Sequence, residues 1–299
     1  MNDFSVKLNK YVSEFNSFVK CEMDSSTYAN RESEGSVKML EAMSYSLSNG
    51  GKRIRPVLTM EFCNACGGDY KSSLNFALAL EMVHTYSLIH DDLPCMDNDD
   101  MRRGKPSNHI VYGYANALLA GDGLLTLAFE EITKSNLDSD KIAKAVKILS
   151  TAAGFTGMIA GQVMDLENEN RAVDIEKVKK TDSLKTGEMI KAAAVLGCVA
   201  GNASDEFIKA AETYCSDIGL AFQIVDDILD VTSDEETLGK PINSDSENSK
   251  TTYVSLLGIE ECKKTVNALT ENAIKALDVF GDKAEFLKEL AFNLSNRKK

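Results

Sequence analysis

Apolar side chains recur at three- and four-residue steps along most of this chain, which is the spacing of one face of an α-helix. Val37, Leu40, Met43 and Leu47 form one such row, and the glycines at 50–51 predict its end. No stretch shows a convincing alternation of apolar and polar residues, the pattern that indicates a strand. The sequence therefore predicts an all-α fold.

The stretch 72–90 is apolar on most sides. A helix of this kind belongs in the centre of a helical bundle, and Pro94 predicts where it ends. The chain contains only 4 prolines, which also favours long helices. Further helices are expected at about 115–134, 140–167, 174–200, 206–229, 251–277 and 283–295.

The length of 299 residues allows one large domain or two average ones. Because no linker and no solenoid repeat is found, we expect a single domain, 1–299, built as a helical bundle around a deep central cavity.

The chain carries 33 basic and 46 acidic residues, a net charge of −13. This balance is unlike that of a nucleic-acid binder, and it does not support a polybasic membrane anchor. No uninterrupted apolar run approaches the roughly 18 residues that span a bilayer, and no secretory signal opens the chain. We therefore expect no stable membrane insertion and a cytoplasmic location.

Seven cysteines are scattered through the chain, an odd number that fits a reducing compartment. Cys63 and Cys66 form a C-x-x-C without a second such pair or a paired histidine. We interpret both as small buried hydrophobic residues, with zinc binding or a redox role as the alternative.

Two acidic motifs each close a long apolar helix and open onto a polar loop. In the first, Asp91 and Asp92 end the central helix, and Pro94 turns the chain so that Asp97 can swing back towards them. The basic pair at 102–103 follows directly. Carboxylates beside cations suit a metal-bridged polyphosphate, in which the acids hold Mg²⁺ and the guanidinium groups grip phosphate oxygens.

The second acidic motif consists of Asp226, Asp227 and Asp230. Asp226 and Asp230 are four residues apart, so on a helix they share a face and repel unless they are solvated or bridged by a cation. A solvated acidic helix end is the alternative for this motif taken alone. If the two motif-bearing helix ends face each other, they form one acid-lined mouth on the bundle cavity.

Other polar residues are candidates for ligand binding beside these motifs. The run at 50–56 presents three cations at a helix start, where backbone N–H groups favour anions, although it lacks the spacing of a P-loop. His84 lies nearly on the helical face of the first motif and is a candidate phosphate donor. Lys185–Thr186 and Gln223 are further candidates, each with the alternative of an ordinary polar helix residue.

Together these residues resemble the trans-isoprenyl diphosphate synthase family, and within it the bacterial farnesyl diphosphate synthases. The resemblance implies the isoprenoid synthase fold. It also implies Mg²⁺-dependent head-to-tail condensation of isopentenyl diphosphate with dimethylallyl or geranyl diphosphate, through ionisation, condensation and elimination. The matching blocks occur in order from about 50 to 253: Gly-Gly-Lys-Arg-Ile-Arg-Pro (50–56), the segment 82–104, Gly161-Gln162-x-x-Asp165-Leu166, Lys185-Thr186-Gly187, Gln223-x-x-Asp226-Asp227-x-x-Asp230 and Lys250-Thr251-Thr252-Tyr253.

The resemblance implies a role for each matching residue. Isopentenyl diphosphate would be bound by Lys52, Arg55, His84 and Arg103. Two Mg²⁺ ions would be held by Asp91, Asp97 and Asp92, and a third by Asp226 with Asp227 and Asp230, with Mn²⁺ as a substitute. The allylic diphosphate would be contacted by Arg102, Lys185, Lys240 and Lys250. The developing carbocation would lie beside Thr186 and Gln223.

Product length depends on the floor of the cavity. Tyr86 resembles the bulky residue that stops bacterial farnesyl synthases at fifteen carbons, although helical phase puts Ser87 more nearly below Asp91. A geranylgeranyl diphosphate synthase is therefore the alternative within the family. A class I terpene cyclase is less favoured, because its second metal pattern would need an acid where Thr237 stands. Family members are commonly homodimers, which we expect here by analogy.

The sequence departs from the family pattern in two places. Asn98 stands where many relatives have an aspartate, and the loop 241–245 differs from the commoner glycine-containing loop. The basic end at 297–299 resembles the family's tail, which can close over the site.

Overall fold

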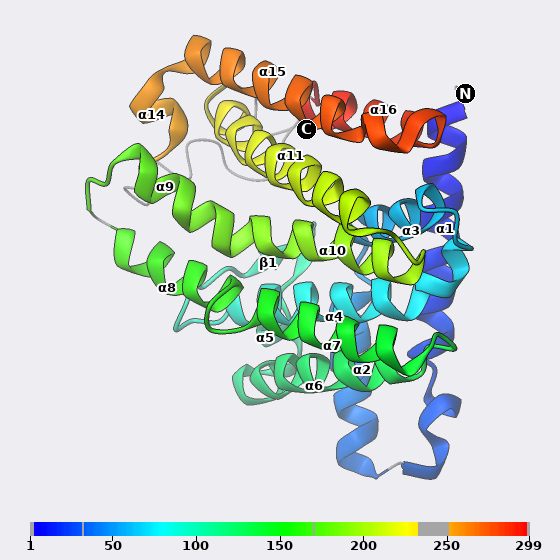
Figure 1. Ribbon diagram of the computed structural model, residues 1–299. Coiled ribbons are helices and arrows are strands. Elements are labelled where there is room, and N and C mark those ends of the chain that lie inside the picture. The colour runs from blue at the N-terminus through cyan, green and yellow to red at the C-terminus, as the bar shows by residue number, and fades with distance from the viewer. Residues whose placement is uncertain (1–2, 32, 170, 233–250, 298–299) are drawn as a thin grey trace.

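The computed structural model describes residues 3–31, 33–169, 171–232 and 251–297, and most of them are helical (Figure 1). The predicted all-α fold class is confirmed. The α-helices are α1 (Asp3–Glu22), α2 (Glu34–Leu47), α3 (Ile54–Ala65), α4 (Leu74–Asp91), α5 (Asn108–Tyr112), α6 (Tyr114–Thr133), α7 (Ser139–Ala153), α8 (Met158–Asn168), α9 (Ile175–Asp182), α10 (Glu188–Ala200), α11 (Asp205–Thr232), α14 (Tyr253–Leu257), α15 (Ile259–Ala276) and α16 (Glu285–Ser295). Short 3₁₀ segments lie at η1 (Ser25–Arg31), η2 (Tyr70–Ser73) and η4 (Leu277–Ala284).

The central helix predicted from the apolar stretch 72–90 is α4. It packs against α6 on one side and against α3 and α10 on the other (Figure 1). Every residue from Phe76 to Val83 is buried. Each fully buried large apolar side chain contributes about 1.5–3 kcal/mol, so α4 is the centre of the hydrophobic core.

Glycines interrupt two helices that periodicity predicts as continuous. The expected helix 140–167 is divided into α7 and α8 at Gly154–Gly157, where a Cβ on Gly157 would lie 2.2 Å from the Ala152 carbonyl oxygen. The expected helix 251–277 is divided at Gly258, whose φ of +77° lies in the left-handed region. Both predictions of a single helix are wrong, because apolar spacing continues across residues whose backbone has left the helix.

The stretch Ser139–Asn168 reaches the length and apolarity of a membrane span, with a mean hydropathy of 1.3 in its most apolar window. It consists of α7, the glycine break and α8, and 33% of that window is buried inside the protein. A single stretch of this kind is weak support for a span, because core helices of soluble proteins reach the same values.

The expected helix 174–200 is continuous in Figure 1, but it contains a π-helical turn, η3 (Ser183–Gly187), between α9 and α10. In such a turn the hydrogen-bond ladder accommodates one extra residue, and these turns occur frequently at functional sites. The turn contacts both α8 and α11.

A two-residue antiparallel ladder follows the first acidic motif. Strand β1 (Met101–Arg102) pairs with β2 (Lys105–Pro106), and the two central residues of the turn, Arg103 and Gly104, both have positive φ. Positive φ at both central positions is the geometry of a tight hairpin turn whose twist matches the strands. The hairpin presents the basic pair at 102–103 on a short rigid loop.

A buried ion pair joins the start of α3 to α4. Arg53 Nη1 lies 2.8 Å from Glu81 Oε1, and the two side chains are 2% and 3% exposed. Arg53 also donates to the Leu47 carbonyl oxygen at 2.7 Å and to Asn16 Oδ1 at 3.1 Å. The middle cation of the 50–56 run therefore points into the protein and stabilises the turn that carries its neighbours.

We expect Arg53→Met to lower the free energy of unfolding by about 3–5 kcal/mol, because it leaves the Glu81 carboxylate buried without its charge partner. The double variant Arg53→Met/Glu81→Leu removes both charges and should recover a large part of that loss. Urea denaturation followed by circular dichroism measures both values. A single variant as stable as the unaltered protein would contradict the role given to this pair.

Candidate active site

The first acidic motif lies in the turn that ends α4. Asp91 is the last residue of the helix, and the Asp97 N–H donates to the Asp91 carbonyl oxygen at 2.8 Å. Asn98 has a φ of +54°, a left-handed conformation that asparagine tolerates better than most residues. The turn thus brings the backbone of Asp97 back to the helix end, as the sequence predicts.

The two carboxylates at the helix end have different electrostatic surroundings. Burial raises the pKa of Asp91 to about 6, with the Lys185 ammonium opposing this rise and the Asp97 charge adding to it. Burial also raises the pKa of Asp92, but Asp92 accepts charged hydrogen bonds from Arg102, with Nε 2.8 Å from Oδ1. Asp92 is therefore paired with a guanidinium. A cation bound at Asp91 would stabilise the charged form of that carboxylate, which burial disfavours.

Positive charge concentrates beside the start of α3. Arg103 donates to the Gly50 carbonyl oxygen at 2.8 Å and packs against Gly51, where a Cβ would lie 2.7 Å from the guanidinium carbon. The buried Nε of Arg55 has no hydrogen-bond partner among the described residues. Burial, followed by the charges of Arg55 and Arg103, lowers the pKa of His84 well below its usual range, so the imidazole is neutral. An anionic ligand binds where positive charges lie beside hydrogen-bond donors that still need an acceptor, and Arg55 and Arg103 provide both.

The π turn carries Lys185 and Thr186. Lys185 Nζ lies 2.7 Å from Asp165 Oδ2 of α8. Gly161, one turn earlier on α8, lies against the Lys185 backbone so closely that a Cβ would be 2.1 Å from the Lys185 nitrogen. Helix α8 therefore positions the π turn through both a backbone contact and an ion pair.

The second acidic motif lies at the end of α11, and its three carboxylates have different surroundings. Asp226 Oδ1 lies 2.6 Å from Arg297 Nη2, which comes from the C-terminal end of the described chain. Asp227 Oδ2 accepts from the Tyr253 N–H at 2.7 Å, at the start of α14. Asp230 is buried, at 3% exposure.

Phe222, one helical turn before Asp226, connects the second motif to the cations. Lys52 Nζ lies 5.9 Å from the centroid of its ring, and the Arg297 guanidinium lies 3.9 Å from it. Cations are attracted to the faces of aromatic rings. The structure thereby brings the 50–56 run beside the helix of the second motif, where the half-buried Gln223 also lies.

The acids fit a partial metal site. In the described residues, no three acidic, histidine or cysteine side chains lie close enough together to hold an ion by themselves. Mg²⁺ commonly uses one or two carboxylates and completes its shell with waters and substrate phosphates. Asp91 beside Asp97 suits this arrangement, because a hard cation would relieve both the desolvation and the repulsion that raise the pKa of Asp91.

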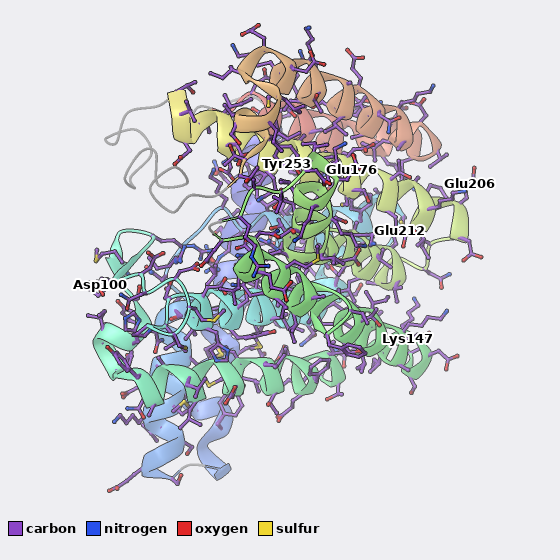
Figure 2. The ribbon with its side chains drawn as sticks, turned by 90° about the vertical axis from the view of Figure 1, so that its left-hand side faces the viewer. Asp100, Lys147, Glu176, Glu206, Glu212 and Tyr253 are labelled. Carbon is purple, nitrogen blue, oxygen red and sulfur yellow. The ribbon has the colours of Figure 1, made fainter. Side chains whose placement is uncertain are left out.

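A groove of about 580 Å³ lies elsewhere, between α7, α10 and α11. Lys147 and Glu212 line it, and Figure 2 shows both on the opposite side of the view from Asp100, which follows the first motif. Among the predicted site residues that the structure describes, none lines this groove. We therefore locate the candidate site by the acidic motifs.

The two residues predicted to limit product length differ in their surroundings. Tyr86 is buried and packs edge-on against His90, with 5.6 Å between ring centroids. Burial and then the Asp91 charge raise the pKa of Tyr86 to about 12. The Ser87 hydroxyl instead donates to the His84 carbonyl oxygen at 2.9 Å.

Some predicted residues lie outside the described part of the chain, and the structure adds others. Lys240, Lys250 and the loop 241–245 are not described. Asp165 belongs to the matching block 161–166, but the sequence predicts no role for it. Its four-residue spacing from Gly161 puts both residues on one face of α8. The contact of Arg297 with Asp226 is also new, since the sequence pointed only to a basic tail.

Comparisons with known proteins show the family of the chain. The Polyprenyl synthetase family model matches residues 37–290. The chain is 46% identical over 253 residues to farnesyl diphosphate synthase of Micrococcus luteus, which covers 84% of this chain and 87% of that protein. It is 47% identical over 243 residues to geranylgeranyl pyrophosphate synthase 3, chloroplastic, of Arabidopsis thaliana, with coverages of 79% and 68%.

A solved structure agrees in fold. The geranyltransferase from Helicobacter pylori, complexed with magnesium and isoprenyl diphosphate, has a TM-score of 0.83 and 34% identity, covering 99% of this chain and 97% of that one. Matches of this extent confirm the resemblance based on the motifs. The chain therefore belongs to the polyprenyl synthetase family and is a prenyltransferase.

Proposed function

We propose that this protein is a farnesyl diphosphate synthase, which condenses isopentenyl diphosphate with dimethylallyl and geranyl diphosphate and releases diphosphate. The observation that carries the proposal is the meeting of acids and cations at the end of α4. There the Asp91 carboxylate is within electrostatic range of Asp97, Lys185 and Arg102. The relative from Micrococcus luteus carries the same activity in its name.

Isopentenyl diphosphate binds at the start of α3. Its phosphate oxygens accept hydrogen bonds from Arg55, whose buried Nε is unpartnered, and from Arg103 and the neutral His84. Lys52 adds a charge at the mouth, beside Phe222. Charge-assisted hydrogen bonds of this kind are about twice as strong as neutral ones.

The allylic diphosphate binds beside the first motif. Arg102 and Lys185 reach it, and in this structure these cations contact Asp92 and Asp165 instead. An allylic C–O bond breaks when the negative charge that develops on the leaving diphosphate is neutralised. By the family resemblance, Lys240 and Lys250, which lie outside the described residues, would supply further positive charge.

The side-chain oxygens of Thr186 and Gln223 lie beside the developing carbocation. The double bond of isopentenyl diphosphate attacks the cation, and a proton then leaves, with the released diphosphate as its acceptor. Exclusion of water by the surrounding apolar helices prevents capture of the cation as an alcohol.

Three Mg²⁺ ions, or Mn²⁺ in their place, would be held by Asp91, Asp92 and Asp97 on one side and by Asp226, Asp227 and Asp230 on the other. When bound, the metal supplies Lewis-acid stabilisation of the leaving diphosphate. Arg297 contacts Asp226 in this structure, so its guanidinium competes with a cation for that carboxylate.

A geranylgeranyl diphosphate synthase is the second candidate. The identity of 47% to the Arabidopsis thaliana enzyme favours it, and the buried ring of Tyr86 below the first motif favours the shorter product. Product analysis separates the two.

We further infer one isoprenyl synthase domain, 1–299, in a cytoplasmic homodimer. A continuous core that includes both Phe4 and Leu294 supports the single domain. Exposed apolar side chains on α5 and α6 support the dimer, since Ile110, Tyr114 and Leu118 are 50%, 63% and 46% exposed. Exposed apolar surface can mark a protein interface.

The direct test is product analysis of the purified chain with labelled isopentenyl diphosphate and geranyl diphosphate in the presence of Mg²⁺. Chromatography after dephosphorylation should show a fifteen-carbon alcohol as the main product, and EDTA should abolish it. A twenty-carbon main product would favour the second candidate. Absence of prenyl transfer would refute both, and activity that survives chelation would refute the metal mechanism.

Tyr86→Ala should shift the main product from fifteen towards twenty carbons, because it removes the buried ring that we propose to limit the length of the growing chain. The matched control is Ser87→Ala, whose hydroxyl contacts the helix backbone and should leave product length unchanged. The same chromatographic assay measures both. An unchanged fifteen-carbon product from Tyr86→Ala would show that Tyr86 does not limit product length.

Gly161→Ala should lower kcat about 100-fold, because its Cβ would displace the backbone of Lys185, and misplacement by about 1 Å is enough for such a loss. Gly187→Ala is the control, since its Cβ would have no neighbour closer than 3.6 Å. It should keep activity within about threefold. Circular dichroism verifies that both variants fold, and equal kcat values would contradict the role of the α8 contact.

Leu118→Glu should convert the dimer to a monomer, because it places a charge among the exposed apolar side chains of α5 and α6. Sedimentation equilibrium should give about twice the chain mass of 32.6 kDa for the unaltered protein and once that mass for the variant. Phe292→Glu on α16 is the control, because Phe292 is also exposed, at 62%, and lies on another helix. A monomeric unaltered protein would disprove the dimer.

A further inference from the structure

Cysteines gather where α3 meets α10, away from the acidic motifs. Cys66 Sγ lies 3.8 Å from Cys198 Sγ, although 132 residues separate them in sequence. The C-x-x-C spacing pairs Cys66 with Cys63, but Cys63 Sγ lies 3.4 Å from the Asp69 carbonyl oxygen and 3.8 Å from Ser72 Oγ. The sulfur that Cys66 contacts by a hydrogen bond is therefore on another helix.

Glycines bring the two helices into backbone contact at this point. A Cβ on Gly197 would lie 2.3 Å from the Thr59 carbonyl oxygen, and one on Gly201 would lie 2.8 Å from Cys66 Cβ. Cys198 lies between these two glycines, so its backbone position opposite α3 is closely constrained. A disulfide bond is about 2.05 Å long, so the two sulfurs need to approach by less than about 2 Å.

The two thiols differ in access and acidity. Cys198 is fully buried, whereas Cys66, at the end of α3, is half-buried. The Cys198 thiol and then the Lys283 ammonium lower the pKa of Cys66, while the hydrogen bond to Cys66 and burial raise the pKa of Cys198. Thiolate character and exposure both make Cys66 the thiol that an oxidant meets first.

We propose that Cys66 and Cys198 form a reversible disulfide when the protein meets a peroxide. The Cys66 thiolate attacks one peroxide oxygen, which breaks the O–O bond and leaves a sulfenic acid on Cys66 and one water. The Cys198 sulfur then attacks the Cys66 sulfur, and the sulfenic oxygen leaves with the thiol proton as a second water. Overall, two thiols and one hydrogen peroxide give one disulfide and two waters, and a dithiol reductant reverses the change.

The bond would tie together two helices that serve the site. Helix α3 begins beside the cations of the 50–56 run, and α10 continues from the π turn that carries Lys185. A cross-link between residues so distant in sequence restricts the unfolded chain strongly, so the oxidised protein is more resistant to heat.

The test uses the full chain with Cys21→Ser and Cys95→Ser, because these two exposed thiols would otherwise link separate molecules. The reduced protein is treated with hydrogen peroxide, free thiols are blocked with N-ethylmaleimide, and the tryptic digest is analysed by mass spectrometry without reduction. We expect peptide 54–71 to be linked to peptide 192–209, and dithiothreitol to separate them. The thermal midpoint should rise by about 5 °C or more on oxidation.

Peptide 54–71 contains Cys63 as well as Cys66, so single variants assign the bond. In the same background, Cys63→Ser should keep both the cross-link and the rise in midpoint, and Cys66→Ser should lose both. Three outcomes would overturn the proposal: a bond within peptide 54–71, a cross-link that persists in Cys66→Ser, or oxidation of Cys66 without any link to Cys198. The half-buried position of Cys66 makes it the safer substitution if Cys198→Ser fails to fold.

Discussion

The arrangement of the candidate site depends on the pairing of partly buried acidic and basic side chains. Carboxylates and guanidinium groups withdrawn from water are costly unless each meets an opposite charge. Arg102 meets Asp92, Lys185 meets Asp165, and Arg297 meets Asp226. These pairs draw together the hairpin after α4, the π turn with α8, and the C-terminal end with α11. The three ion pairs therefore arrange the site by charge.

The scaffold that holds these charges relies on close contacts between helix backbones. Gly161 lets α8 lie against Lys185 at the π turn, and Gly197 lets α3 lie against α10 further along the same continuous helix. The segment from the π turn through α10 is thus located at both ends by contacts that leave no room for a side chain. Such contacts are stiff, because a closely packed interior resists small displacements.

Much of this arrangement can be predicted from sequence, because it depends on the spacing of residues that are close together in the chain. The apolar run predicts the helix that ends at Asp91, and Pro94 predicts the turn that brings Asp97 back towards it. The motif residues are recognisable because their types and order are specific to one chemistry. The Asp97 backbone returns to the end of α4, where the Asp91 carboxylate is within electrostatic range of Arg102.

What escapes prediction depends on backbone conformation or on residues far apart in sequence. Periodicity continues through Gly154–Gly157 and Gly258, although the helices end there. The partner of Cys66 is on α10, and nothing in the spacing of Cys63 and Cys66 points to it. Arg53 looks like its neighbours in the 50–56 run, yet its partner Glu81 turns it inward. Each of these features requires the three-dimensional packing of separate helices.

The π turn at Ser183–Gly187 also constrains how this protein can change in evolution. One residue of an α-helix corresponds to a rotation of about 100°, so loss of a residue here would turn the face of α9 by that angle relative to α10. An insertion or deletion in a loop changes only the length of that loop, but within this continuous helical segment it would rotate one helix out of its packing. The number of residues in the segment therefore sets the relative orientation of α9 and α10, whatever their identity.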